Sequence, residues 1–179
     1  QRKARELMGA QAKSFKSLEW LELKNGGEEY LEDMRVAQQY ARINRRLMAA
    51  LLIEEFFKKK FHRLQRISSV HNYIDFDDRI IRKGAIRAYR DEKLVIPFNM
   101  EEGLIIATGK SNPAWNYSAP HGAGRVLSRR QAKESLSLSE AKRMMKEKKI
   151  FTTSLSAATL DEVKGAYKAK ELIMNSIED

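Results

Sequence analysis

The stretch LVIPFNMEEGLIIA, residues 94–107, decides the fold class of this 179-residue chain. It holds two apolar runs of strand length, 94–96 and 104–107, with turn-forming residues between them. The same pattern extends toward the N-terminus, where residues 70–75 and the pair Ile80-Ile81 are further short runs. Turn residues separate all of these runs, at Gly84, Asp91, Pro97, Gly103 and Gly109. The central part of the chain is therefore predicted to form short strands.

Upstream of these strands, apolar residues recur at helical spacing from Glu28 to about Leu64, with charged residues between them. This spacing predicts one long helix, or two in tandem, after the turn sequence Asn25-Gly26-Gly27. The far end of the predicted helix is strongly basic over residues 58–66. Cations suit the partial negative charge of a helix C-terminus, and a solvated basic end is the simpler interpretation. His62 lies in this basic tail, where we expect it to be exposed.

Downstream of the strands, residues 110–117 predict a loop, and residues 122–124 predict irregular backbone. Helices are expected at about 129–134, 139–148 and 166–177, with a short strand near Phe151. Ser137 and Glu140 have the spacing of a capping box for the second of these helices. The order of helix, strands and helices predicts an α+β fold, with a long N-terminal helix, central mixed or antiparallel strands and C-terminal helices.

Composition narrows the class of protein further. Hydrophobic residues make up 42% of the chain and charged residues 32%, which excludes a disordered polymer and, because charge interrupts every long apolar run, a membrane protein. The absence of cysteine excludes disulfides, thiolate metal sites and cysteine nucleophiles, and it favours a reducing, cytoplasmic location. The 34 basic against 24 acidic residues give a net charge of +10. This excess favours a polyanionic partner, RNA or DNA first, with solubility alone as the alternative.

The string SAPHGAGRVLSR, residues 118–129, gathers groups that suit phosphate chemistry. Gly122 and Gly124 lack a Cβ atom, so that backbone amides can approach a phosphate closely. Arg125 can hold phosphate oxygens through two parallel hydrogen bonds. His121, largely neutral at neutral pH, offers a ring nitrogen as base, metal ligand or nucleophile. We therefore expect a phosphate-handling site centred on His121, with an ordinary glycine-rich loop as the alternative.

A second histidine, His71, lies with Asn72 on the predicted strand 70–75. A histidine on a strand is either a metal ligand or a packed core residue, and the neighbouring amide can meet a phosphate or orient the ring. Trp115 and Tyr117 precede the histidine loop, where they can stack on a base or pack in the core.

Three cations gather around Gly84 in the sequence Arg82-Lys83-Gly84-Ala85-Ile86-Arg87. This cluster suits phosphate binding, and a solvated turn explains it nearly as well.

Several of these motifs together resemble the signature of the RtcB family of GTP-dependent RNA-splicing ligases. The most specific is His121-Gly122-Ala123-Gly124-Arg125, followed by Leu127-Ser128-Arg129 and Ala132. Other elements follow the order of that family along the chain: His71-Asn72, Arg82-Lys83-Gly84-Ala85, Ile96-Pro97 with Met100, Gly109, Asp161-Glu162 and Ala166-Tyr167-Lys168. The resemblance runs from about residue 18 to residue 179. Residues 1–179 thus resemble a single C-terminal portion of an RtcB-like ligase domain, and we expect them to be a fragment of a longer chain.

The resemblance implies a reaction. In such ligases a histidine, here His121, attacks the α-phosphate of GTP with Mn²⁺ bound, and a histidine–GMP intermediate forms. GMP then passes to the 3′-phosphate end of an RNA, and a 5′-hydroxyl end displaces it to seal the strand. A 2′,3′-cyclic phosphate end is first opened by hydrolysis. The implied RNA partners are tRNA halves or other cleaved RNA, and an archease-type activator is a further implied partner.

The resemblance also implies roles residue by residue. His121 and Arg125 are the implied catalytic residues, His71 is the implied metal ligand, and Tyr167 corresponds to the guanine pocket. The remaining implied nucleotide contacts are Asn72, Lys83, Pro97, Phe98, Asn99, Met100, Gly122, Ala123 and Gly124.

This chain departs from the family pattern in ways that bear on activity. Most of the family reads Pro-Gly-Ser-Met-Gly where residues 97–101 read Pro-Phe-Asn-Met-Glu, and Lys164 replaces a proline. We expect Glu101 to bring a charge that repels phosphate, while Asn99 can still donate a hydrogen bond. The family's other metal ligands belong to a part N-terminal to these residues, and its closing lysine lies beyond Asp179. The N-terminal half of the same enzyme is therefore an expected partner. The alternatives are a catalytically inactive basic nucleotide- or RNA-binding module and a structural protein with an inert core histidine.

Overall fold

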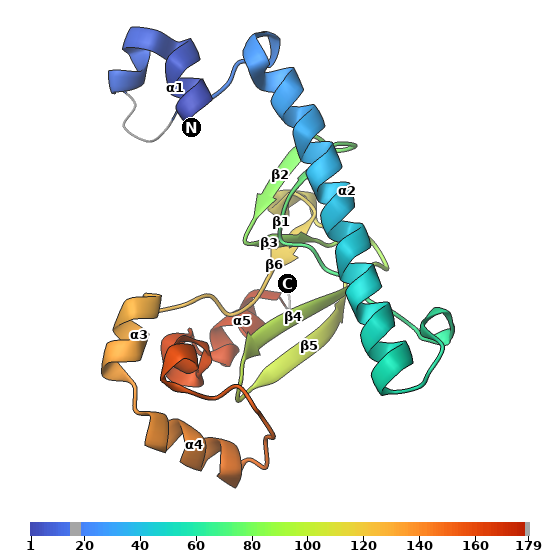
Figure 1. Ribbon diagram of the computed structural model, residues 1–179, viewed down its shortest axis with the longest axis vertical. Coiled ribbons are helices and arrows are strands. Elements are labelled where there is room, and N and C mark those ends of the chain that lie inside the picture. Colours follow the sequence, from blue (N-terminus) through green and yellow to red (C-terminus); the bar gives the residue numbers. More distant parts are fainter. Residues whose placement is uncertain (15–18, 178–179) are drawn as a thin grey trace. The chain divides into compact units, whose positions relative to one another are not determined.

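The computed structural model describes residues 1–14 and 19–177, and it divides the chain into two compact units, Gln1–Gln65 and Arg66–Asp179 (Figure 1). The regular structure in the described part of the first unit is helical. The second unit combines small antiparallel sheets with helices. This composition confirms the predicted α+β class, while the assignment of residues 1–179 to one portion of a larger domain stays a prediction.

The first unit is dominated by a long helix, α2 (Glu28–Leu51), which continues as the π-helical turn Leu52–Phe56. A short helix, α1 (Arg2–Met8), precedes it. Helix α2 begins after the predicted turn: Gly26 has a φ of +85°, and a Cβ on Gly27 would lie 2.6 Å from a backbone oxygen. Glu28 and Glu29 then place negative charge in the first helical turn, which the helix dipole favours.

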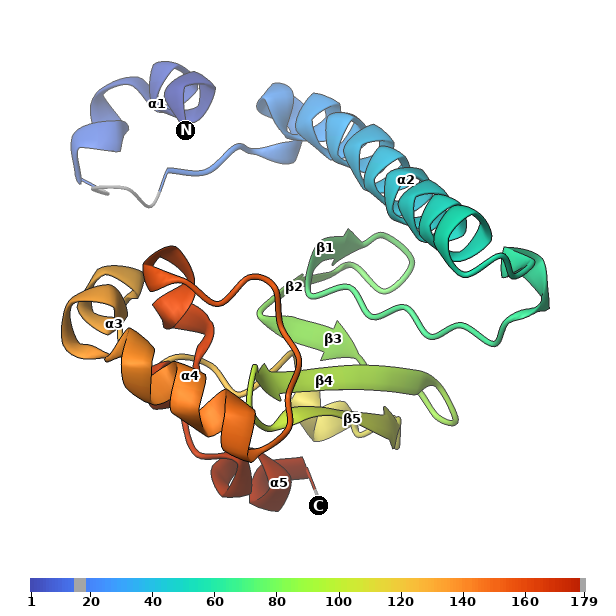
Figure 2. The same ribbon diagram turned by 60° about the horizontal axis from the view of Figure 1, so that its bottom comes forward.

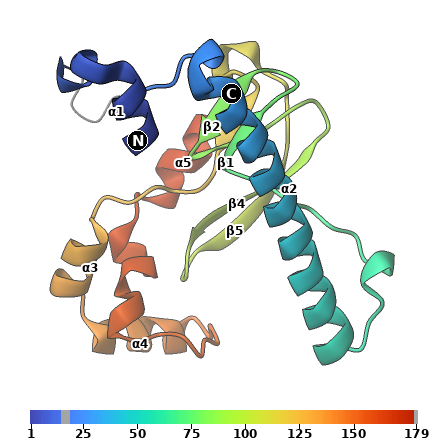
Figure 3. The same ribbon diagram turned by 45° about the horizontal axis from the view of Figure 1, so that its top comes forward.

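The predicted helix is too long at its C-terminal end. Helical structure stops at Phe56, because Lys58 adopts a positive φ of 53°. Residues 61–63 form a separate 3₁₀ turn, in the loop that leaves the helix (Figure 3). His62, in this turn, is exposed as predicted. The basic segment therefore follows the helix rather than forming its last turn.

The second unit contains three two-stranded antiparallel sheets in its described residues. Strand β1 (Asn72–Asp75) pairs with β2 (Ile80–Lys83), and β3 (Ala85–Arg87) pairs with β6 (Ser118–Pro120). Strand β4 (Lys93–Asn99) lies beside β5 (Gly103–Thr108), as Figure 2 shows. Alternate residues of β4 are buried because successive strand side chains point to opposite faces. Two of them, Leu94 and Ile96, form a core with Ile86 of β3 and Ala88, which follows β3.

Three helices follow the strands: α3 (Arg129–Ser135), α4 (Leu138–Glu147) and α5 (Lys170–Ile177). Two 3₁₀ turns, Ala157–Glu162 and Lys164–Ala166, precede α5. A second core forms where α4 meets these turns, through Ala141, Leu160 and Val163. The sequence predicts α3 and α4 correctly. At the predicted capping box, Ser137 caps α4 by accepting the N–H of Glu140. A capping box with both of its hydrogen bonds forms at Ser128 and Gln131, at the start of α3.

Two expectations about the C-terminal region are wrong. Residues around Phe151 form no strand, and Phe151 is 89% exposed. The last helix begins at Lys170 rather than at residue 166, because residues 164–166 form a 3₁₀ turn and Tyr167 pairs with Arg125 in a β-bridge. The predicted loop 110–117 is confirmed, with one 3₁₀ turn inside it. Over residues 1–14 and 19–177, no helix has both the length and the apolar character needed to cross a membrane.

Candidate active site

A pocket of about 840 Å³ lies in the second unit, within the usual ~300–1,000 Å³ of small-molecule sites. Its wall comes from the start of β1, the end of β4, the loop after β6 and the segment before α5. The lining residues are His71, Pro97, Phe98, Asn99, Met100, His121, Gly122, Ala123, Gly124, Arg125, Ser154, Thr159, Glu162 and Tyr167. Every predicted site residue except Asn72 and Lys83 lines this pocket. The fold thus brings together residues that lie up to 96 positions apart, from His71 to Tyr167.

The two histidines of the pocket stack on each other. The ring centroids of His71 and His121 are 4.9 Å apart, and the ring planes differ by 19°. Burial, and then the nearby ring of His121, lowers the pKa of His71 below its usual value. His71 is therefore a neutral imidazole at neutral pH, which is the form that binds a metal ion.

Gly84, between β2 and β3, determines which nitrogen of His121 carries the proton. Its carbonyl oxygen lies 2.6 Å from Nδ1 of His121. Because a carbonyl only accepts hydrogen bonds, Nδ1 carries the proton in the neutral tautomer of His121, and Nε2 then keeps its lone pair. The N–H of Gly84 donates to the carbonyl of His71 at 2.8 Å and to Oδ1 of Asn72 at 3.1 Å. Asn72 thus holds the residue that orients His121.

The sequence analysis missed this role of Gly84. Its φ is +70°, and a Cβ there would lie 3.4 Å from Cε1 of His121. Glycine is the residue that adopts such a φ without steric cost. A lone glycine between two apolar strand runs was the feature of the sequence that could have indicated an unusual backbone conformation here. No feature of the sequence indicated the contact with a histidine 37 positions away.

The opposite part of the pocket is built around Glu162. Its carboxylate accepts hydrogen bonds from the guanidinium of Arg125 and from the hydroxyl of Tyr167. The guanidinium carbon of Arg125 lies 5.2 Å from the centre of the Tyr167 ring. Burial, followed by the hydrogen bond to Glu162, raises the pKa of Tyr167 to about 12. The phenol therefore stays protonated at neutral pH. Sequence reasoning named Glu162 only as part of a family motif and gave it no place in the pocket.

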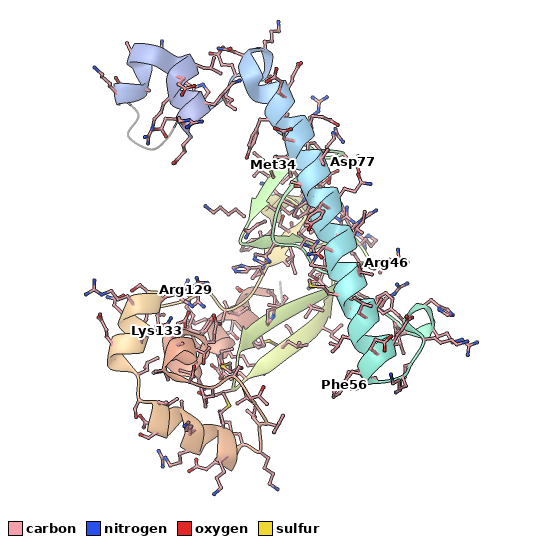
Figure 4. The ribbon with its side chains drawn as sticks, in the orientation of Figure 1. Met34, Arg46, Phe56, Asp77, Arg129 and Lys133 are labelled. Carbon is pink, nitrogen blue, oxygen red and sulfur yellow. The ribbon has the colours of Figure 1, made fainter. Side chains whose placement is uncertain are left out.

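A buried carboxylate, Asp161, contacts Arg125 but does not itself line the pocket. It is 6% exposed and lies 3.5 Å from the guanidinium of Arg125. Two further cations from α3 approach it, Arg129 at 3.4 Å and Lys133 at 3.8 Å, and Figure 4 labels both side chains. Arg125 also donates from Nε to the carbonyl oxygen of Asp161 at 3.1 Å. The guanidinium is therefore held in place by acidic partners before any ligand binds.

The end of β4 forms a packed wall. Phe98 is 2% exposed, and Nζ of Lys170 lies 5.2 Å from the centre of its ring. The Asn99 side chain closes the turn after β4: its oxygen accepts the N–H groups of Glu101 and Glu102 at 3.0 Å, and its nitrogen donates to Glu102 at 2.7 Å. The amide donor of Asn99, predicted to meet phosphate, is thus engaged within the turn.

The structure corrects the expectation that Glu101 repels phosphate. Its side chain is 8% exposed, does not line the pocket and lies 3.1 Å from Nζ of Lys148. The negative charge is compensated by a cation that lies 47 residues later in the chain.

The structure also corrects the predicted cation cluster around Gly84. Arg82 is 2% exposed and forms an ion pair with Asp75 at 3.0 Å. Arg87 pairs with Glu92 at 2.8 Å. Lys83 and Arg87 are both exposed, but neither lines the pocket. The cluster is therefore mainly structural.

The two aromatic residues before the histidine loop also lie outside the pocket. Trp115 is 57% exposed, and the ring of Tyr117 packs against Tyr89 with centroids 5.6 Å apart. Tyr117 therefore has a packing role, and neither residue is placed to stack on a base in this pocket.

The residues that the structure describes do not complete a metal site. Over residues 1–14 and 19–177, no three or more His, Cys, Asp or Glu side chains gather closely enough to hold an ion. His71 contributes one neutral imidazole to the pocket. A manganese site at this position needs ligands in addition to those that the described residues bring together.

Replacing Gly122 by alanine tests the close packing of the histidine loop. A Cβ at this position would lie 2.7 Å from the carbonyl oxygen of Pro97, so the loop and β4 would have to move apart. We expect the free energy of unfolding to fall by about 2 kcal/mol in urea denaturation. Gly103→Ala is the control, because its Cβ enters open space and only a positive φ opposes it, at about 1 kcal/mol. Equal losses for the two variants would contradict the close packing.

Comparison with known proteins agrees with the motifs. A family model described as "tRNA-splicing ligase RtcB" matches residues 3–179. The RNA-splicing ligase RtcB of Escherichia coli (strain K12) is 27% identical over 166 residues, covering 85% of this chain and 40% of that protein. The tRNA-splicing ligase RtcB of Aeropyrum pernix is 30% identical over 174 residues, covering 79% and 36%. The chain thus spans about two fifths of the length of these relatives. With the family model matching nearly its whole length, the chain belongs to the RtcB family.

Proposed function

We propose that this chain carries the nucleophile of an RNA ligase that joins 3′-phosphate or 2′,3′-cyclic-phosphate ends to 5′-hydroxyl ends, using GTP and Mn²⁺. The observation that carries the proposal is the setting of His121. It lines a pocket of suitable size, and the carbonyl of Gly84 leaves the lone pair on Nε2. Membership of the RtcB family supports the reaction class, since the relatives are named as RNA-splicing ligases.

In the proposed reaction, Nε2 of His121 attacks the α-phosphorus of GTP. A nitrogen–phosphorus bond forms, the bond from the α-phosphorus to the β-phosphate oxygen breaks, and pyrophosphate leaves. An oxygen of the RNA 3′-phosphate then attacks the same phosphorus, so that GMP passes to the RNA and the imidazole is regenerated. Finally, the 5′-hydroxyl oxygen attacks the 3′-phosphate, GMP leaves, and the hydroxyl proton passes to water. Hydrolysis opens a cyclic phosphate end before these steps.

The other residues of the pocket bind and orient the nucleotide in this proposal. Backbone amides of residues 122–124 meet the phosphates, and the cation of Arg125 compensates their charge. Tyr167 contributes a protonated phenol and a flat ring to the guanine. The strand end 97–100 forms the wall beside the nucleotide. Asn72 acts through Gly84 rather than by direct contact.

Mn²⁺, when bound, compensates the negative charge of the triphosphate and polarises the α-phosphate. We propose His71 as one ligand, because its ring lies against His121 and its lowered pKa keeps it neutral. The N-terminal half of the same enzyme is the proposed source of the remaining ligands. RNA with a 3′-phosphate and a 5′-hydroxyl end is the proposed substrate, and an archease-type activator is a proposed partner.

One observation favours a second candidate, a basic nucleotide- or RNA-binding module without catalysis. The described residues bring only an incomplete set of metal ligands to the pocket, while the chain carries a net charge of +10. Such a module would bind GTP or RNA but would form no covalent bond with either.

The experiment that separates the two functions uses GTP radiolabelled in the α-phosphate. The natural protein that contains these residues is incubated with the label and Mn²⁺ and is then denatured. We expect a covalent adduct that is labile in acid and stable in alkali, as a phosphoramidate is. GTP labelled in the γ-phosphate is the control and should leave no label, because pyrophosphate departs. Reversible binding without an adduct would support the binding module, and retention of the γ-label would contradict the proposed reaction.

A further inference from the structure

The turn between β4 and β5 carries two partly buried glutamates that are paired with lysines from distant segments. The side chains of Glu101 and Glu102 are 8% and 11% exposed. Glu101 accepts from Nζ of Lys148 at 3.1 Å and from the backbone N–H of Lys164 at 3.3 Å. Glu102 lies 2.6 Å from Nζ of Lys164. We name Glu101, Glu102, Lys148 and Lys164 the turn clamp.

The turn clamp connects two walls of the pocket. On one side it begins directly after the strand end 97–100, which lines the pocket. On the other side, Lys164 lies in the chain between Glu162 and Tyr167, the pair that holds Arg125. A backbone bond from the N–H of Met100 to the carbonyl of Glu162, at 3.2 Å, runs between the same two segments. The four clamp residues themselves lie outside the pocket lining.

Two members of the turn clamp, Glu101 and Lys164, are among the positions that depart from the family pattern implied by the sequence resemblance. In that pattern a glycine corresponds to Glu101 and a proline to Lys164. A glycine has no carboxylate, and a proline has no N–H to donate. The hydrogen bond from Lys164 to Glu101 therefore needs both departures together, since either family residue alone would remove it.

The charges of the turn clamp are mutually stabilised. Burial by itself would raise the pKa of Glu102, but hydrogen bonds from Lys164 and Asn99 outweigh burial and lower the pKa. The hydrogen bond to Glu102 in turn raises the pKa of Lys164. Because Lys164 is 48% exposed, solvent screens part of this attraction. The carboxylates are the buried partners, so they are the groups that lose most when a lysine is removed.

We propose that the turn clamp fixes residues 97–100, at the end of β4 and just after it, against the segment 162–167 and so sets the affinity of the pocket for GTP in this protein. Its members are positioning residues, because they act through the two walls. This inference rests on the proposed function, since GTP is the ligand by which it is measured.

The local backbone allows the family residues to be restored. Val163, which precedes Lys164, has φ −82° and ψ 161°, the extended conformation that a residue before proline requires. Lys164 itself is the first residue of a 3₁₀ turn, a position that tolerates proline because its N–H makes no hydrogen bond within the turn, and its bond to Glu101 is the one that the change removes. Lys164→Pro is therefore expected to fold. Lys164→Ala removes the ammonium group and keeps the N–H. It therefore separates the ion pair with Glu102 from the backbone hydrogen bond to Glu101.

The test measures the dissociation constant for GTP and the thermal unfolding midpoint of the natural protein carrying Glu101→Gly, Lys164→Pro or both changes. We expect each single change to weaken GTP binding about tenfold. The double change should weaken it by less than the product of the two, because both changes remove the shared bond from Lys164 to Glu101, while the contacts with Lys148 and Glu102 are lost separately. Lys164→Ala should weaken binding less than Lys164→Pro. Lys142→Ala, an exposed lysine on α4, is the control and should leave binding unchanged.

The outcomes separate this inference from the proposed function. If the wild-type protein binds no GTP, the proposed function and the role of the clamp in the pocket both fail. If the wild type binds GTP and the two single variants bind it equally well, the positioning role of the turn clamp is overturned and the proposed function is not. Additive shifts of the unfolding midpoint would show that Glu101 and Lys164 do not act as a pair, and would overturn the clamp whatever the result with GTP.

Discussion

Replacing His121 by alanine will abolish covalent labelling from α-labelled GTP at every concentration of Mn²⁺. The methyl group of alanine has no nitrogen lone pair, so the bond to phosphorus has no donor. The loss should be complete, because Nε2 of His121 is the atom that the carbonyl of Gly84 leaves unprotonated in the pocket. The measurement is label incorporated against Mn²⁺ concentration. Recovery of labelling by His121→Ala at high Mn²⁺ would refute the nucleophile.

His71→Ala is the matched comparison, because the two rings lie 4.9 Å apart in the same pocket. Removing a metal ligand lowers metal occupancy, which a higher Mn²⁺ concentration raises again by mass action. We therefore expect partial recovery of labelling for His71→Ala. Arg125→Lys keeps the charge and loses the planar fork, so it should slow labelling without abolishing it. If His71→Ala bound Mn²⁺ normally and still failed to label, the ligand role would be wrong.

Replacing Arg82 by alanine will destabilise the second unit by about 3–5 kcal/mol, the usual cost of leaving one buried charge without its partner. Arg82 is 2% exposed, and its ion-pair partner Asp75 is 5% exposed. The guanidinium also donates to Ser118 Oγ at 3.0 Å and to the carbonyl of Asn116 at 3.2 Å, so it joins β2 to the segment before the histidine loop. Urea denaturation followed by circular dichroism measures the loss.

The control for this change is Arg90→Ala, which removes the same side chain at an exposed turn and should cost no more than about 0.5 kcal/mol. A similar loss for Arg82→Ala and Arg90→Ala would mean that the buried ion pair contributes nothing. Arg82→Lys is expected to recover part of the stability, because it keeps the charge but cannot reach all four partners of the guanidinium.

Features set by neighbouring residues could be predicted from the sequence. The start of α2 follows from Gly26 and Gly27, and the paired strands β4 and β5 follow from two apolar runs around a turn. The expected strand at Phe151 was wrong because an apolar residue near a helix end does not by itself supply a pairing partner, and this side chain is 89% exposed.

Contacts between distant residues could not be predicted in this way. The family motif placed His121 and Arg125 correctly in one pocket, since they are close in the sequence. The pairing of Arg82 with Asp75 depends on the β1–β2 register, which puts Tyr73 opposite Arg82 and Asp75 two residues further on. The pairing of Glu101 with Lys148 depends on how α4 packs against the turn. Arg82, which suited phosphate binding in the sequence, and Glu101, which was expected to repel phosphate, are both used instead to hold the fold.

The carbonyl of Gly84 has a consequence for the reactivity of the proposed histidine–GMP bond. In that adduct Nε2 is bonded to phosphorus, and the carbonyl oxygen 2.6 Å from Nδ1 keeps the proton on Nδ1. The ring then carries a positive charge and departs as neutral imidazole, which is a far better leaving group than an imidazolide anion. A carboxylate in the same place would hold the cation more tightly and slow the transfer. Because the acceptor is main chain, no substitution of a side chain can remove it, and the group-transfer potential of the bond is fixed by the path of the backbone between β2 and β3.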